Sequence, residues 1–352
     1  MNKKLLSAAI VAACAAAPAA FADAVVYGKA HVSVDAIDYE ATSSVLAPAE
    51  KDNYEVNSRS SRLGFKGSED LGNGLKAIYQ FEFGIDVDDN SGINNGRNTF
   101  VGLAGDWGTF LVGRHDTPQK LAFYAAGNER LGDSIIDLNR SNASWDISGG
   151  APIGVFHEAR VDDAIAYVTP NFSGFTAAVA IVPGEDDGVA TGTGTGGADG
   201  LADHWSAGLM YSGNGLKASV GYTDYSGDQG KANADDTTVF QVGASYTFNN
   251  FSIGAQYEDS DLADVVDYTA WAVTGKFTFG NNALSLVYTD SEFDVGGGSA
   301  GDEETTGWGL AAEHNFSKRT KVYAAYATNE VEVSGGDDGD QDVFSLGMIH
   351  SF

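Results

Sequence analysis

The stretch that decides the fold is "FSLGMIHSF" (344–352), the last nine residues of the sequence. Soluble domains usually end in a few loosely held polar residues, whereas this stretch alternates in size to its last residue. Successive side chains of a β-strand point to opposite faces. One face would carry Phe344, Leu346, Met348, His350 and Phe352, and the other Ser345, Gly347, Ile349 and Ser351. We therefore expect a structured strand, and the fold depends on which of its faces meets water.

The same alternation recurs along the chain. The stretches "VVYGKAHVSVDA" (25–36), "LKAIYQFEF" (75–83) and "FQVGASYTF" (240–248) each place apolar residues on one face and polar or small residues on the other. A period of two with one apolar face predicts β-strands. The chain also has 45 glycines among 352 residues, against an average of about 7%. Both features predict an all-β chain with many turns.

Two kinds of connection separate these segments and alternate strictly along the chain. Short connections with tight-turn residues are expected at 69–74, 105–108, 170–174, 212–215, 248–250, 279–282 and 316–320. Long, acidic connections are expected at 38–53, 86–95, 116–156, 184–201, 226–234, 259–266, 292–304 and 331–341. Seven short and eight long connections separate 16 strands of about ten residues. All short turns would then lie at one end of the sheet and all long loops at the other.

Three architectures compete for this pattern. A soluble β-sandwich would bury the apolar faces between two sheets, and its long loops would fall at both ends. A calcium-binding parallel β-solenoid needs a short repeat with fixed glycine and aspartate spacing, which this sequence does not show. A closed barrel turns its apolar face to lipid, keeps a polar interior and pairs every backbone group. We predict an all-β fold, a 16-stranded antiparallel transmembrane β-barrel, which is wide enough for an aqueous channel.

The first 22 residues differ from the rest. Two lysines precede the apolar stretch 5–13, and Ala20 and Ala22 have the spacing of a signal-peptidase site, so we expect a signal peptide over 1–22 and the barrel over 23–352. A lipid-modified Cys14 is the alternative. Cleavage after Ala22 would remove the only cysteine and leave 18 Lys and Arg against 49 Asp and Glu, a net charge of −31. That balance argues against binding nucleic acid, which requires a basic surface.

The sequence lacks the short patterns typical of catalytic and metal-binding sites. The six histidines are dispersed, with no paired spacing suited to a metal and no G-x-S-x-G element. We therefore predict no catalytic residue, no metal site and no cofactor. Divalent cations bridging the acidic loops to neighbouring lipopolysaccharide remain an alternative without a coordination loop to name.

Three stretches carry a resemblance to a known family. "SRLGFKGSEDLGNGLKAIYQFEFG" (61–84), "RNTFVGLAGDWGTFLVGRHDTP" (97–118) and "AIAYVTPNFSGFTAAVA" (164–180) resemble the general diffusion porins of Gram-negative bacteria. The resemblance implies a homotrimer of barrels in the outer membrane, each with a water-filled pore for passive diffusion of small hydrophilic solutes and ions. It also implies an inward-folded third long loop that forms the pore constriction. A plugged structural or adhesive barrel is the alternative.

The candidate constriction loop is the segment 116–156, whose length suggests a functional role. Thr117 as N-cap, Pro118 at the first helical position and Gly127 as the stop predict a short helix. Its apolar residues, Leu121, Ala122, Phe123 and Tyr124, would anchor it to a wall. An exposed extracellular loop is the alternative.

The resemblance also suggests which residues face this loop. It places Lys29, Arg62, Arg97 and Arg160 on the barrel wall, and Arg114 precedes the loop. The alternative is that these are ordinary lumen residues paired with wall carboxylates. Acidic partners on the loop are available at Asp116, Glu129, Asp133 and Asp137, and also Asp146, but no motif singles out two of them. Whether cations or anions are preferred stays open.

The last strand has two expected roles. It should pair with the first strand, 24–35, to close the barrel, so that Phe344, Leu346, Met348 and Phe352 face lipid. The terminal Phe352 also resembles the signal read by the outer-membrane assembly machinery, which would be a partner together with lipid and lipopolysaccharide.

Overall fold

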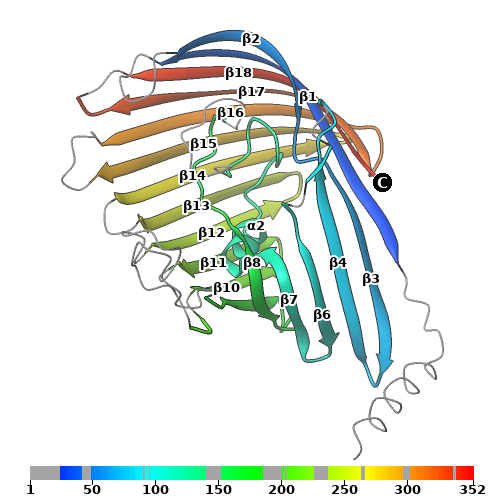
Figure 1. The fold of residues 1–352 in the computed structure, drawn as a ribbon. Helices are drawn as coiled ribbons and strands as arrows, with labels where there is room; N and C mark the ends of the chain where they lie inside the picture. Colours follow the sequence, from blue (N-terminus) through cyan, green and yellow to red (C-terminus); the bar gives the residue numbers. More distant parts are fainter. Residues whose placement is uncertain are drawn as a thin grey trace, which may run out of the picture.

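The computed structural model describes residues 24–41, 49–89, 92–94, 96–139, 152–184, 200–202, 204–225, 237–262, 266–295, 302–335 and 338–352. The expected signal peptide and the loop residue Asp146 lie outside the described residues. The described chain is almost entirely β-strand (Figure 1). Among the described residues, no helix is both long enough and apolar enough to span a membrane.

The described residues form 18 strand segments and one helix, α2 (Pro118–Ala125). The first nine strands are β1 (Val25–Ala41), β2 (Ala49–Ser58), β3 (Arg62–Gly72), β4 (Leu75–Ile85), β5 (Ile93–Asn94), β6 (Thr99–Gly105), β7 (Gly108–Asp116), β8 (Arg160–Val168) and β9 (Phe175–Val182). The others are β10 (His204–Gly213), β11 (Leu216–Asp224), β12 (Thr238–Phe248), β13 (Phe251–Leu262), β14 (Val266–Phe279), β15 (Asn282–Val295), β16 (Glu303–Asn315), β17 (Thr320–Val333) and β18 (Gly339–Ser351).

These 18 segments occupy 16 positions in one antiparallel sheet. β2 and β3 both pair with β1, β2 along 32–41 and β3 along 25–29, so they form one interrupted wall strand. β5 and β6 likewise both pair with β4. β18 pairs with β1, and β9 pairs with β10, so the strands form a closed ring. The predicted 16-stranded antiparallel barrel is therefore confirmed.

The seam between the two ends of the chain is continuous. β1 and β18 are paired in register from Lys29 opposite Ser351 to Ala41 opposite Gly339. The terminal residue extends this ladder: the Gly28 amide donates to the Phe352 carbonyl at 3.0 Å, and the Phe352 amide donates to the Gly28 carbonyl at 3.1 Å. The Phe352 ring lies where a Cβ of residue 28 would project. Glycine at position 28 is therefore needed for the last residue to complete the seam.

The two faces of the wall differ as the alternation predicts. In β12, Phe240, Val242 and Tyr246 are exposed on the outside, whereas Gln241 and Ser245 are buried on the inside. In β18, Phe344, Leu346 and Met348 are about half exposed and Ser345 is fully buried. The outer face is thus apolar over most of its height, and the inner face is lined by small and polar residues.

Aromatic rings form belts near both ends of the strands. At the short-turn end, the rings of Phe248, Phe251, Phe277 and Phe279 stack in a row across β12–β14. Toward the long-loop end, cross-strand pairs join tryptophan and tyrosine: Trp205 with Tyr222, Trp271 with Tyr288, and Trp308 with Tyr326. Aromatic belts at both edges of an apolar band are typical of membrane-spanning barrels.

Several strands are longer than the ten residues expected, and the connections predicted at 38–53, 259–266, 292–304 and 331–341 are shorter. β13 and β14 extend through the predicted loop 259–266 and leave only 263–265 between them. β1 continues to Ala41, β15 to Val295 and β17 to Val333. Those boundaries were wrong because acidic residues were assigned to loops, whereas backbone pairing continues through them.

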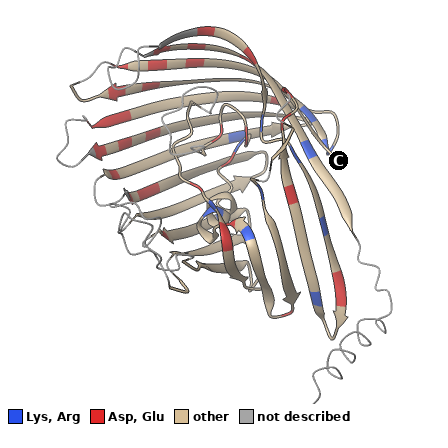
Figure 2. Cartoon of the chain, in the orientation of Figure 1, with Lys and Arg blue, Asp and Glu red and all other residues tan. Residues whose placement is uncertain are grey.

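Acidic residues at these extended ends face outward in rows. Glu304 lies directly opposite Glu292 on one side and Glu332 on the other, and Asp38 lies between Asp342 and Asp52. Figure 2 shows acidic residues gathered at the long-loop ends of the strands. Like charges directly opposite each other destabilise a sheet, so these rows depend on solvent and salt for screening. The large negative charge of the protein therefore lies partly on the outer face beyond the apolar band.

Candidate functional site

The described parts of the connection between β7 and β8, residues 117–139 and 152–159, contact the inner face of the wall. Its helix α2 begins where the sequence predicts: the Thr117 side chain accepts a hydrogen bond from the Lys120 amide at 3.2 Å, and Pro118 occupies the first turn. Gly127 follows the helix with φ +72°. α2 contacts β10, β11 and β12 (Figure 1).

Glycines on the wall make room for this helix. A Cβ on Gly221 would lie 2.8 Å from the Cα of Gln119, and one on Gly243 would lie 2.8 Å from the Cβ of Ala126. A Cβ on Gly208 would collide with the carbonyl of Pro118. Three adjacent strands thus present a glycine track, Gly208, Gly221 and Gly243, along which the helix backbone runs.

Serines beside the track fix the helix by hydrogen bonds. The Ser206 hydroxyl accepts from the Gln119 amide at 3.0 Å. The Ser219 and Ser245 hydroxyls donate to the carbonyls of Ala122 and Ala126, both at 2.6 Å. A helix leaves its first amides and last carbonyls without partners inside the helix. The wall supplies partners for groups at both ends of α2.

An apolar cluster packs residues 131–138 and 153–156 of the loop against the wall. Ile135, Ile136, Leu138, Ile153 and Phe156 are fully buried. They belong to the same core as residues on the inner faces of the distant strands, including Tyr268, Ala270, Val287, Ala311 and Ala325. The predicted anchoring of α2 holds for Ala122 and Phe123, which are buried, but it was wrong for Tyr124, which is 41% exposed.

The exit of the loop is held by a buried carboxylate. Glu258 on β13 has no exposed side-chain surface. It accepts from the His157 amide at 2.8 Å, the Gln241 side-chain amide at 2.6 Å and the Ser260 hydroxyl at 2.9 Å, and it pairs with the His157 ring. The loop is therefore fastened to the wall at its entrance, its middle and its exit.

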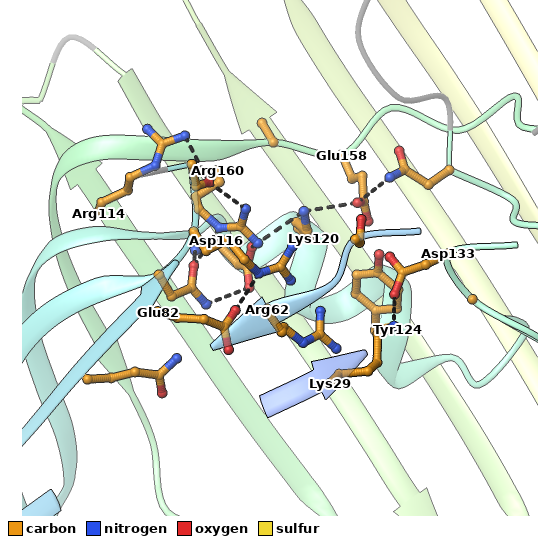
Figure 3. Close-up of a pocket in the computed structure, with 18 of the residues that line it drawn as sticks. Lys29, Arg62, Glu82, Arg114, Asp116, Lys120, Tyr124, Asp133, Glu158 and Arg160 are labelled. Carbon is orange, nitrogen blue, oxygen red and sulfur yellow. Dashed lines mark hydrogen bonds and ion pairs between the residues drawn. The ribbon is translucent and has the colours of Figure 1, made fainter. Parts of the chain in front are cut away.

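Between this loop and the opposite part of the wall lies a cavity of about 1280 Å³. All five basic residues singled out from the sequence border it: Lys29 of β1, Arg62 of β3, Arg97 before β6, Arg114 of β7 and Arg160 of β8 (Figure 3). Tyr124 and Lys120 of α2 also line the cavity. The structure thus brings together bases that are far apart in the sequence.

Each arginine of the cavity except Arg62 has a carboxylate partner, and the partners of Arg97 and Arg160 also line the cavity. Arg97 Nε lies 2.5 Å from Glu82 Oε1. Arg114 Nη1 lies 2.7 Å from Asp162 Oδ1. Arg160 Nη2 lies 2.7 Å from Asp116 Oδ1.

The two lysines of the cavity are paired as well. Lys29 forms an ion pair with Asp133 of the loop, and Lys120 Nζ lies 2.9 Å from Glu158 Oε1. Five of these six bases thus make an ion pair with a carboxylate, and Arg62 is the one of the six for which the described residues show no ion pair.

Sequence reasoning missed three members of this network. Glu82 was recognised only as part of the polar face of its strand, although an inward acid beside Arg97 is a natural partner for it. The ion pair between Lys120 and Glu158 could not be predicted from the sequence, because it depends on the path by which the loop returns to the wall. Lys120 Nζ also lies 3.4 Å from Asp116 Oδ1, which links the helix to the wall.

The candidate loop acids fall into two groups. Asp133 lines the cavity, and so does Asp116, but Asp116 is the last residue of β7 and belongs to the wall. Glu129 and Asp137 are not among the lining residues. They lie side by side beneath the surface of the loop, where Glu129 Oε1 accepts from the Leu138 amide at 2.9 Å and Asp137 Oδ1 accepts from the Asn139 amide at 2.8 Å.

Burial gives these loop carboxyls different acidities. Burial, and then the neighbouring carboxyl charges, raise the pKa of Glu129 well above its usual value and the pKa of Asp137 to about 7. Burial also acts to raise the pKa of Asp133, but the Lys29 ammonium, with smaller contributions from Arg62 and Arg97, lowers it overall. Asp133, which faces the cavity, is therefore ionised at neutral pH. The buried pair Glu129 and Asp137 instead favours a state in which the two carboxyls share one proton.

Within the part of the chain that the structure describes, no group of three His, Cys, Asp or Glu side chains is placed to hold a metal ion. The arrangement at the cavity offers fixed charges and hydrogen-bonding groups around a water-accessible space.

The chain belongs to the Gram-negative porin family, since residues 8–334 match that family's model. Major outer membrane protein P.IA of Neisseria meningitidis serogroup C is 30% identical over 182 residues, 47% of this chain and 42% of that protein. Outer membrane porin protein 32 of Delftia acidovorans is 27% identical over 334 residues, 93% of this chain and 89% of that protein. The chain spans about half the length of the neisserial relatives that it matches.

Solved structures agree on the fold. The anion-selective porin from Comamonas acidovorans has a TM-score of 0.68 at 23% identity, covering 94% of this chain and 100% of that chain. The trimer form of OmpT of Vibrio cholerae has a TM-score of 0.64 at 17% identity, covering 94% of this chain and 99% of that chain. With the family membership, the closed barrel identifies a multi-pass β-barrel of the outer membrane.

The glycine track gives a prediction for stability. Gly221→Ala should lower the unfolding temperature of the purified barrel, because overpacking of a filled site costs about 1–3 kcal/mol and the new methyl group would meet the backbone of Gln119. Gly275→Ala is the matched control, since a Cβ at position 275 has nothing within 4 Å. Equal unfolding temperatures for the two variants would contradict a docking role for the track.

The hidden carboxyl pair gives a prediction for pH. Glu129 and Asp137 have higher pKa values in the folded protein than in the unfolded chain, where carboxyls titrate near 4. The folded state therefore holds a proton that the unfolded chain releases, and stability should fall as pH rises from about 4 through about 7. Glu129→Gln keeps an acceptor for Leu138 and offers an amide donor toward Asp137. Its unfolding temperature should fall less than that of the wild type between pH 5 and pH 9, and parallel pH profiles would refute the shared proton.

Proposed function

We propose that this protein forms a water-filled channel for passive diffusion of small hydrophilic solutes and ions across the outer membrane. The observation that carries the proposal is the cavity of about 1280 Å³ inside a closed barrel, bordered by charged wall residues on one side and by the fastened loop on the other. The porin family and the porins among its relatives support it. In this proposal no residue acts catalytically, and the solute gradient drives the flux.

We infer that residues 117–139 and 152–159, the described parts of the connection between β7 and β8, form the constriction of the channel. Asp133 and Glu158 of the loop lie across the cavity from Lys29 and Arg62 (Figure 3), and Arg97 also lines the cavity. Opposed rows of fixed charge create a transverse field, which orients dipolar solutes and disfavours apolar ones. Lys29 and Asp133 form an ion pair across the cavity. The transverse field is therefore expected in the open part of the cavity next to this ion pair.

The assembly proposed for the channel is a homotrimer in contact with lipid and lipopolysaccharide. The support is a resemblance to porins, among them the trimer form of OmpT of Vibrio cholerae. A barrel plugged by its loop, with a structural or adhesive role, is the second candidate, favoured by the extensive apolar contact between the loop and the wall. Steady single-channel conductance in planar bilayers would support diffusion, and electrically silent insertion would support the plug.

The constriction is tested by Arg62→Ala combined with Arg97→Ala. Loss of two long side chains should widen the cavity and leave Glu82 without its partner, so single-channel conductance should rise and cation permeability should increase. Arg319→Ala, in the exposed turn between β16 and β17, is the control and should leave both quantities unchanged. Conductance of the double variant equal to that of the wild type would rule out this constriction.

We propose that Phe352 is the recognition signal for the outer-membrane assembly machinery. Deletion of Phe352 should lower the amount of folded barrel in the outer membrane, because it also removes the two hydrogen bonds to Gly28. Phe352→Ala keeps those backbone bonds and removes only the ring. A recognition role predicts that both variants assemble poorly, whereas normal assembly of Phe352→Ala would leave only the seam bonds as the cause.

A further inference from the structure

The outer face of the barrel has a groove beside the seam between the two ends of the chain. It spans β15, β16, β17, β18 and β1 and has a volume of about 780 Å³. Its floor is formed by Ala312 and Ala324, which lie opposite each other on β16 and β17. Leu284 pairs with Ala312 on one side, and Leu346 pairs with Ala324 on the other. Two small side chains between two exposed leucines thus form a hollow in the apolar band.

The groove continues toward the short-turn end of the strands. The next row of outward residues on the same strands consists of Asn282, His314, Val322, Met348 and Val32. Two of them are polar: His314 Nδ1 lies 2.8 Å from Asn282 Oδ1. The His314 ring also packs edge-on against the exposed ring of Phe316. The groove is therefore apolar at its floor and polar where it reaches the aromatic residues of the short-turn end.

Positive charge lies at this polar end of the groove. The turn 316–319 joins β16 to β17, the two strands that carry the floor, and it contains Lys318 and Arg319, both exposed. The nearest acidic residue in the sequence, Glu313, faces the lumen and is paired there with two inward lysines. No lysine or arginine occurs in the other six short turns, which are 73–74, 106–107, 169–174, 214–215, 249–250 and 280–281. The one basic short turn of the barrel thus lies at the end of this groove.

The distance from the floor to the basic turn matches one leaflet of a bilayer. Arg319 precedes Ala324 by five residues, which is about 17 Å along a strand at about 3.3 Å per residue. Strands of membrane barrels are tilted by about 35–45°, so the turn lies about 13 Å from the floor along the membrane normal. Half of the hydrocarbon core is about 15 Å thick. A lipid whose acyl chain lies over Ala324 would therefore place its headgroup at the level of Lys318 and Arg319.

A second groove on the outer face lacks a basic turn. It has a volume of about 590 Å³, and Ala218, Ala244 and Ala255 lie in register across β11, β12 and β13 as its floor. The turns at its short-turn end, 214–215 and 249–250, contain only glycine and asparagine. Both grooves are apolar, and only the groove beside the seam ends at positive charge.

We propose that the groove over Ala312 and Ala324 is a binding site for one anionic glycerophospholipid, with an acyl chain on the alanine floor and the phosphate at Lys318 and Arg319. The short turns of outer-membrane barrels face the periplasm, so the lipid belongs to the periplasmic leaflet. Basic side chains at a membrane surface attract anionic headgroups. This inference rests on the proposed contact with lipid and names the class of lipid and its place on the wall.

A second copy of the chain is the competing occupant of the groove. Its Glu69 and Asp106 lie at the short-turn end of its own barrel, where they could meet Lys318 and Arg319. Lipid is favoured because the apolar floor and the basic turn follow each other in the order of chain and headgroup, over the depth of one leaflet. The two occupants predict different results when these acids are removed.

Binding is measured by native mass spectrometry of the purified barrel in detergent, titrated with phosphatidylglycerol or with phosphatidylcholine of the same acyl chains. The first phosphatidylglycerol should bind about tenfold or more tightly than phosphatidylcholine, because each base at a membrane surface contributes about fivefold. Lys318→Gln combined with Arg319→Gln should remove this preference. Lys66→Gln combined with Lys76→Gln is the charge-matched control and should preserve it, since both lysines lie on the lumen face of the β3–β4 hairpin.

The floor is tested by Ala324→Leu, which fills the groove and should abolish the tight binding of phosphatidylglycerol. Ala244→Leu is the matched control, because it fills the second groove, which has no basic turn, and should leave the tight binding intact. Both positions face outward, and equal unfolding temperatures would show that the two barrels remain folded.

Equal affinities of the wild type for the two lipids, or equal losses in the variants and their controls, would overturn the lipid site. Dissociation of an oligomer by Ala324→Leu and by Glu69→Gln with Asp106→Asn, with lipid binding unchanged, would assign the groove to a second copy and also overturn it. A wild-type barrel that binds phosphatidylglycerol but carries no current in planar bilayers would overturn the channel function and support the lipid site.

Discussion

The constraint on which this structure depends is the absence of water around the strands. An amide or carbonyl left unpaired in hydrocarbon costs several kcal/mol, so a sheet in a membrane cannot keep a free edge. The ladder between β1 and β18, completed by Gly28 and Phe352, removes that edge. Closure then divides every strand into an outer face for lipid and an inner face for water. The polar residues of the strands can line an interior only because closure of the barrel creates one.

The inner face has two separate tasks, which fall to different residues. Gly208, Gly221 and Gly243 bring the backbone of α2 close to the wall, and serines hold its ends. The bases and acids across the lumen then meet as pairs. Wall glycines and serines that lie behind α2 therefore largely determine the position of the loop. The charge that a solute meets is determined by other residues, the bases and acids that line the cavity.

Much of this arrangement could be read from the sequence. Period-two alternation identifies the strands and their faces, and "TPQKLAFYAAG" (117–127) identifies the helix start and stop. Alternation predicts which face of the strand a residue occupies, but it predicts neither the position of the residue along the barrel axis nor the residue with which it pairs. Pairing of Lys120 with Glu158, and the place of Glu129 behind the cavity, depend on the path of a loop through contacts distant in sequence. The break between β2 and β3 was missed as well: the prediction placed a loop at 38–53 and a single strand between it and the turn at 69–74, because alternation alone does not reveal where pairing is interrupted.

The seam also has a consequence for the order of events in assembly. β1 and β18 are about three hundred residues apart in the sequence, so their contact is the most non-local pairing among the described strands. Non-local contacts are slow to form because the ends of a long chain must be brought together first. Until the last strand arrives, β1 keeps an open edge that can pair with another chain. Before the barrel closes, this protein is therefore most at risk of strand pairing with other chains.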